Sequence, residues 1–278
     1  MPLLSKKEVL NLKLKSIPLS QLKELADKLR VDTSGPVATL IKRMMEQPAI
    51  EEFSINSFIK EKYAERISER RKLITDNELK QELMKVQDFS WGIVQGQLDQ
   101  KIQREYVRKF VRYDELIGNV KNHLHNEITS YVICTWFNHW TTVLVEEHIS
   151  QHPKVVPTLK NIKGVDIFFN NQPFDLKTTY IPKNYNIDEA IKNPKELAIW
   201  MYEKQGDQRF DANNRLFVIL SDKENPEDSW KLKRNFDLVF RAIDNFFDTT
   251  VVSTEDEIIF VFKKKTYTTI SKTLIIVK

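Results

Sequence analysis

Two acidic residues and one lysine, close together in the chain, have types and a spacing that could carry chemistry. Asp166 lies within the apolar run Val-Asp-Ile-Phe-Phe, and Asp175 and Lys177 lie within Phe-Asp-Leu-Lys-Thr-Thr. Because side chains alternate between the two faces of a β-strand, Asp175 and Lys177 share one face. A hairpin that joins the two runs would bring Asp166 to the same face, so the three groups would converge.

Converging carboxylates of this kind favour metal-assisted hydrolysis. Two carboxylates a few ångströms apart repel each other, and burial increases the cost of their charges. Mg²⁺ relieves both costs, and it binds through one or two carboxylates, water and a substrate phosphate. Such a metal can polarise a phosphoryl oxygen and activate a bound water. We therefore expect Mg²⁺, with Mn²⁺ as a substitute, on Asp166 and Asp175, with Lys177 positioning the attacking water.

The hairpin register decides whether these groups meet. We expect a turn over residues 170–173, which pairs Phe169 with Phe174 and places Asp166 opposite Lys177. A slip of one residue would turn one strand's side chains to the other face. In the alternative interpretation the hairpin is exposed, and Asp175 and Lys177 form a surface ion pair that contributes little.

The elements around the hairpin predict a mixed fold. A long helix over residues 119–151 is apolar on nearly all sides, so we expect it to be buried against a sheet. Strands and helices in mixed order predict an α/β or α+β core with helices on the faces of a sheet. Further strands are expected at 216–220, 258–262 and 273–277, with helices at 187–205, weakened at Pro194, and at 231–247.

The acid and lysine pattern resembles the PD-(D/E)xK nuclease site, which is found in many restriction endonucleases. Asp166 matches the first acid, and Asp175-Leu176-Lys177 matches the second acid, the spacer and the lysine; Val165 stands where the family often has proline. The resemblance covers about residues 120–222 and implies a restriction-endonuclease-like core, a mixed central sheet flanked by helices.

The same resemblance implies a further acid from the helix before the hairpin. Glu127 is the first choice, as a catalytic residue and a metal ligand, and Glu146 and Glu147 are the alternatives. It also implies a Mg²⁺-dependent endonuclease acting on double-stranded DNA, most of all a type II restriction endonuclease that works as a homodimer.

The N-terminal segment resembles a second family. Helices are expected around residues 19–29, with Ser20 as the cap, and 37–45, joined by a turn at Gly35. Their sequence resembles a SAP module, a DNA-binding unit with little sequence preference. Val37 stands where the family usually has lysine, so phosphate contacts are expected from Lys23, Lys42 and Arg43. The alternative is a helical hairpin that binds protein.

The distribution of charge agrees with a DNA partner. Residues 1–46 hold nine lysines and arginines and five acids, so nine minus five equals the chain's whole net charge of +4. Arg104 and Arg108 lie on a basic helix face, which is either a second DNA-facing surface or a solvated face over a core. Polar residues after 180 could contact base edges, among them Lys183, Asn184, Arg209 and Asn214. We expect three domains: a SAP-like module (1–47), a helical linker region (48–118) and the nuclease domain (119–278).

The composition excludes some kinds of site and predicts where the protein is found. A single cysteine, Cys134, excludes an intramolecular disulfide and a cysteine-based zinc cluster. Without a signal-peptide core or a membrane-spanning apolar stretch, a cytoplasmic location is expected, with no membrane partner. Two other functions stay open: a non-catalytic DNA-binding protein that keeps the nuclease fold, and a structure-specific repair or recombination nuclease.

Overall fold

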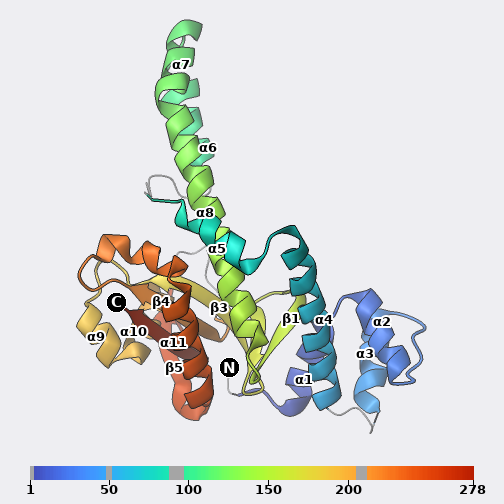
Figure 1. Ribbon diagram of the computed structural model, residues 1–278. Coiled ribbons are helices and arrows are strands. Elements are labelled where there is room, and N and C mark those ends of the chain that lie inside the picture. The colour runs from blue at the N-terminus through green and yellow to red at the C-terminus, as the bar shows by residue number, and fades with distance from the viewer. Residues whose placement is uncertain (1–2, 48–51, 88–96, 205–211) are drawn as a thin grey trace. The chain divides into compact units, whose positions relative to one another are not determined.

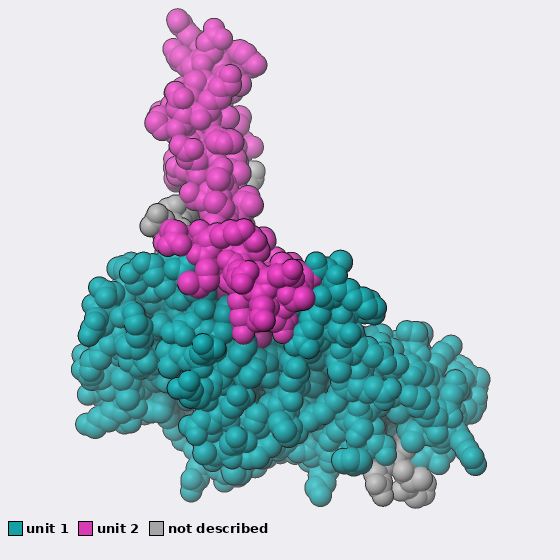
Figure 2. Space-filling view, viewed as in Figure 1, with its two compact units in different colours: residues 1–73, 145–278 teal, residues 74–144 magenta. Residues whose placement is uncertain are grey.

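The computed structural model describes residues 3–47, 52–87, 97–204 and 212–278. The chain forms two compact units, one of residues 1–73 with 145–278 and one of residues 74–144, which Figure 2 shows in different colours. Helix α8 (His125–Gln151) contributes to both units. The expected domain boundaries at residues 47 and 118 differ from these limits, and the three-domain division stays a prediction.

A six-stranded mixed sheet forms the centre of the larger unit (Figure 1). Its strands follow the order β1-β2-β3-β4-β6-β5. Strands β1, β2 and β3 are antiparallel neighbours, β4 lies parallel to β3 and to β6, and β5 is antiparallel to β6. The expected mixed architecture of strands and helices is therefore confirmed. The strands are β1 (Val155–Ile162), β2 (Val165–Phe169), β3 (Gln172–Tyr180), β4 (Arg215–Ser221), β5 (Glu257–Phe262) and β6 (Lys265–Val277).

Helices cover both faces of the sheet around β4, and all seven residues of β4 are buried. Leu216, Val218 and Leu220 pack with α11 (Phe236–Thr249) and the end of α8. Phe217 and Ile219 point to the opposite face and pack with α9 (Ile187–Lys192) and α10 (Pro194–Lys204). Burial on both faces explains why this strand reads as a continuous apolar run.

Two expected helices differ in detail from the observed ones. The helix expected over 187–205 is two helices, which separate just before Pro194, where the sequence predicts a weak point. The helix expected over 231–247 is a 3₁₀ helix (Pro226–Arg234) followed by α11, which begins after Asn235. The Asn235 side chain accepts a hydrogen bond from Leu238 N, as a helix cap does.

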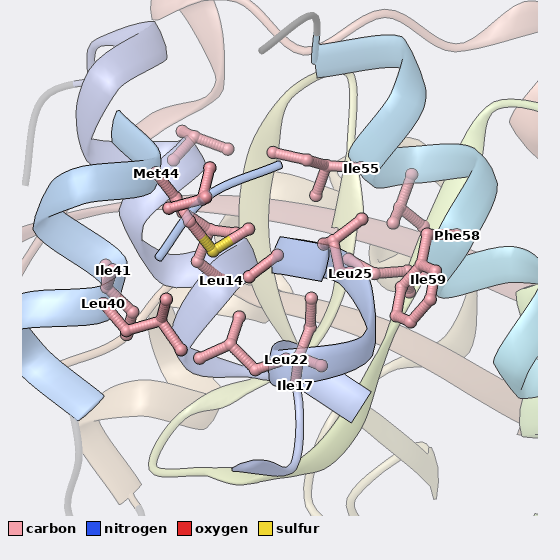
Figure 3. Packing of buried hydrophobic residues seen from close by; sticks show 14 of the residues in the cluster. Leu14, Ile17, Leu22, Leu25, Leu40, Ile41, Met44, Ile55, Phe58 and Ile59 are labelled. Atoms are coloured by element: carbon pink, nitrogen blue, oxygen red, sulfur yellow. The ribbon is translucent and has the colours of Figure 1, made fainter. Parts of the chain in front are cut away.

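Four N-terminal helices share a core with the hairpin. These are α1 (Lys6–Lys15), α2 (Leu19–Lys28), α3 (Val37–Glu46) and α4 (Glu52–Leu73). Figure 3 shows Leu14, Leu22, Met44 and Ile59 from these helices in one apolar cluster, which also contains Phe168 of β2. The expected module therefore packs directly against the strands that carry the candidate site.

The first helix begins at a motif that sequence reasoning missed. Ser5 and Glu8 form a reciprocal capping box at the start of α1. The expectation that Ser20 caps the next helix is wrong, because α2 begins at Leu19 directly after Pro18 and has no side-chain cap.

The smaller unit is helical. It contains α5 (Asp76–Met84), α6 (Gln97–Lys101), π-helical turns at Ile102–Val107 and Val120–Leu124, α7 (Tyr113–Asn119) and the first part of α8. The expectation that the whole helix is buried is wrong for this part of α8, since Val132 is 55% exposed, although Phe137 is fully buried. Within the described parts of the chain, no helix is both long and apolar enough to cross a membrane.

Candidate active site

A two-residue turn closes the hairpin between β2 and β3. Asn170 and Asn171 have φ values of 45° and 59°, the left-handed conformation that tight hairpin turns require and that asparagine tolerates. Phe169 therefore pairs with Gln172, and Ile167 pairs with Phe174. The expected pairing of Phe169 with Phe174 is wrong because it assumed a four-residue turn.

The register differs from the expected one by two residues, which preserves the faces of the strands. Extending the observed pairing places Asp166 opposite Asp175, and not opposite Lys177. The two strands stop pairing at Phe174, and β3 pairs with β4 from Asp175 onward. In place of a further main-chain bond, Leu176 N donates to Asp166 Oδ2 at 2.7 Å. The hairpin thus holds the two carboxylates next to each other.

The electrostatic surroundings of Asp166 disfavour its charged form. Burial raises the pKa of Asp166, the hydrogen bond from Leu176 N lowers it, and the neighbouring Asp175 carboxylate raises it again. The net direction is upward. A carboxylate in this position gains stability from a cation, as expected for a metal ligand or for a group close to one.

Two cations hold Asp175 in place. Lys177 Nζ lies 2.8 Å from Asp175 Oδ1, and Arg215 Nε lies 3.2 Å from Asp175 Oδ2. The Arg215 side chain is only 8% exposed, and its guanidinium lies 4.9 Å from the centre of the Tyr202 ring. Sequence reasoning missed Arg215, although an arginine that opens an apolar strand is costly to bury without an anionic partner.

Of the three helix acids considered, Glu146 is the one beside Asp166. The pKa of Glu146 is raised to about 7: burial is the largest cause, Asp166 and Asp175 also raise it, and Lys177 and Arg66 lower it. Glu147 instead forms a bidentate ion pair with Arg70.

The first choice, Glu127, belongs to the other compact unit, where its carboxylate accepts a hydrogen bond from Lys101 Nζ at 2.6 Å. The structure therefore favours Glu146 over Glu127. The physical reason is that α8 is long enough to carry acids in both units, and its last part, which carries Glu146, belongs to the same unit as the hairpin.

A cavity of about 260 Å³ opens over Glu146 and Asp166. Its walls come from α4, the end of α8, and strands β1, β2 and β3. Acidic groups therefore lie in a hollow whose wall also carries basic side chains. The other lining residues are Tyr63, Arg66, Ser150, Thr158, Lys160, Asn161, Ile167 and Leu176.

The carboxylates fit a divalent cation that keeps most of its water. Glu146 and Asp166 have raised pKa values, which a nearby cation would offset, and Mg²⁺ needs only one or two carboxylate ligands. Among the described residues, no three or more His, Cys, Asp or Glu side chains form a ready cluster for a metal. Both oxygens of Asp175 have cationic partners, so a metal bound to Asp175 would have to compete with Lys177.

The three basic residues of the N-terminal helices that are expected to bind DNA differ in whether they are paired with an acid. Lys23 is exposed on α2, and Lys42 is exposed on α3 within 3.8 Å of Glu46. Arg43 lies 2.9 Å from Asp32 and donates to the Ser34 carbonyl at 2.6 Å, so it holds the loop between α2 and α3. Of these three, Lys23 is the one whose charge is most available to a partner.

The other residues expected to contact DNA also differ in whether their side chains are already paired. Arg108 and Asn184 are exposed, whereas Arg104 pairs with Glu105 at 2.7 Å and Lys183 pairs with Glu227 at 3.2 Å. Arg209 lies outside the described residues. The expectation that Asn214 reaches a base edge is wrong, because Asn214 is buried and bonds to Pro173 O, Thr269 Oγ1 and Ile270 N.

The arrangement can bind a cation, hold an anion beside it and place an ammonium group next to both. These are the components that hydrolysis of a phosphodiester requires. Comparison with known proteins finds no matching family model, no matching curated protein and no matching solved structure.

Proposed function

We propose that this chain is a Mg²⁺-dependent nuclease that hydrolyses phosphodiester bonds in double-stranded DNA at a site of the PD-(D/E)xK type. One observation carries the proposal: Glu146 and Asp166 share a cavity in which burial raises the pKa of both, and Lys177 lies beside the adjoining Asp175. The resemblance to type II restriction endonucleases extends the proposal to a restriction-endonuclease-like core and a homodimer.

Each residue has a role in this proposal. Asp166 and Glu146 would hold the metal, for which Mn²⁺ would substitute, and Asp175 adjoins them with its two oxygens held by Lys177 and Arg215. When bound, the metal supplies a Lewis acid for the phosphoryl oxygen and lowers the pKa of a bound water. Lys177 is the half-exposed cation at the site, and its ammonium group would position the attacking water and offset negative charge at phosphorus.

Arg215 acts on the reaction through Asp175. Its guanidinium fixes one carboxylate oxygen and is itself fixed against Tyr202, whose hydroxyl donates to Asn213 O at 2.7 Å. Arg215 is therefore a positioning residue, which keeps Asp175 oriented even when Lys177 moves away from it. The N-terminal helices would add salt-sensitive affinity for DNA, chiefly through Lys23.

One observation favours a non-catalytic DNA-binding protein as the second candidate. Both oxygens of Asp175 already have cationic partners, as expected where a lysine and an arginine replace a metal. This candidate predicts DNA binding that is unaffected by metal and by the charge of Lys177.

Cleavage of unmethylated phage DNA tests the proposal. Purified protein is incubated with Mg²⁺ or with EDTA, beside Lys177→Ala and the matched control Lys192→Ala, an exposed lysine of α9. We expect discrete fragments that require Mg²⁺, vanish in Lys177→Ala and persist in Lys192→Ala. Smeared products would indicate a less specific nuclease. Intact DNA on several phage genomes, with DNA binding retained, would reject catalysis in favour of the second candidate.

A further inference from the structure

Two cations on the wall of the catalytic cavity have no role in the mechanism above. Arg66 comes from α4 and Lys160 comes from β1, and both line the cavity that contains Glu146 and Asp166. Both are exposed. Neither side chain forms a hydrogen bond or an ion pair with any other residue that the structure describes. Their charges are therefore available to a ligand in the cavity.

Both cations are held in place without being neutralised. The Arg66 guanidinium lies 5.6 Å from the centre of the Tyr63 ring, a cation–π contact that orients it. The main chain of Lys160 is anchored, because Lys160 N donates to the carbonyl of the buried Ser16 at 2.9 Å. Helix α4 itself packs on β1. The guanidinium of Arg66 and the main chain of Lys160 are thus held by the fold, and both residues line the cavity.

The balance of charge in the cavity indicates what they would bind. Arg66 is close enough to Glu146 to lower its pKa, yet it forms no ion pair with it. A divalent cation on Glu146 and Asp166 would offset the charges of the two acids. The charges of Arg66 and Lys160 would then be unbalanced, so the loaded cavity would attract an anion with more than one negative charge. Consecutive phosphates of a nucleic acid strand supply such an anion.

We propose that Arg66 and Lys160 bind the phosphates on either side of the bond that is cut. This inference rests on the proposed function, since it takes the strand at Asp166 to be the substrate. The planar fork of Arg66 suits a bidentate contact with one phosphate, and Lys160 acts as a point charge on another. The two residues therefore set how far along the strand the enzyme holds its substrate.

The salt dependence of DNA binding tests this inference. Binding of a fluorescent 30-base-pair duplex is measured by anisotropy over a range of salt concentrations, with Mg²⁺, in a Lys177→Ala background that does not cut. We expect Arg66→Gln and Lys160→Gln each to reduce the slope of log K against log salt by about 0.9, and the double variant by about twice that. Arg66→Lys keeps the charge, so it should keep the slope while weakening affinity.

Controls separate this inference from folding effects and from the proposed function. Lys192→Gln should leave the slope unchanged, and thermal unfolding should show that every variant is folded. An unchanged slope in the folded double variant would overturn the inference, whether or not the wild-type protein cuts DNA. A reduced slope would support it, and if the wild-type protein then failed to cut, only the catalytic proposal would be rejected.

Discussion

Replacing Glu146 with glutamine should make the metal-free protein more stable at neutral pH. The pKa of Glu146 is raised from 4.5 to about 7, chiefly by burial. Since one pKa unit corresponds to about 1.4 kcal/mol, the ionised side chain costs the folded state on the order of 3 kcal/mol. Glutamine has nearly the same shape and no charge, so the variant avoids that cost.

The sign of the pH dependence follows from linkage. Between about pH 4.5 and pH 7 the folded protein binds more protons at Glu146 than the unfolded chain does, so its unfolding free energy falls as the pH rises. The penalty is absent below pH 4.5 and complete above pH 7. We therefore expect wild type and Glu146→Gln to be equally stable at pH 4.5, and the variant to be more stable by up to about 3 kcal/mol at pH 8.

Urea denaturation in EDTA, at half-unit steps from pH 4.5 to 8.5, measures this difference. Glu147→Gln is the matched control, because the Glu147 carboxylate pairs with Arg70 and its loss should destabilise the protein at pH 8. Mg²⁺ at a hundred times its Kd should stabilise the wild type by about 2.7 kcal/mol and Glu146→Gln by much less. A stability difference that does not change with pH would refute the argument for Glu146.

Two further predictions concern residues around the carboxylates. Arg215→Leu should lower cleavage and destabilise the protein by roughly 3 kcal/mol, because it leaves the largely buried Asp175 with one cation in place of two. Urea denaturation and cleavage rates measure the two effects, and unchanged cleavage would contradict the positioning role. Gly164→Ala should destabilise the protein by about 1–3 kcal/mol, because Gly164 has φ +73° and an added Cβ would overlap the Asn213 side chain. Urea denaturation measures this effect, and a variant as stable as the wild type would contradict the prediction.

The convergence at the hairpin could be predicted from sequence because it depends on parity alone. Any turn with an even number of residues places Asp166 on the face of Asp175 and Lys177. The choice between a two-residue and a four-residue turn needed more information, namely that both asparagines adopt the left-handed conformation. Arg215 belongs to a strand about forty residues further along, and its pairing with Asp175 depends on the parallel register of β3 and β4, which no local pattern reports.

The choice of the helix acid could not be made from sequence for a related reason. Helix α8 is apolar on nearly all sides, so its pattern does not indicate which residues face the sheet. Consecutive residues of a helix point about 100° apart, and this separates Glu146 from Glu147. Glu147 meets Arg70 and is neutralised, whereas Glu146 meets another acid. A buried acid beside a second acid costs stability unless a ligand offsets the charge, and this cost is the physical reason to assign function to Glu146.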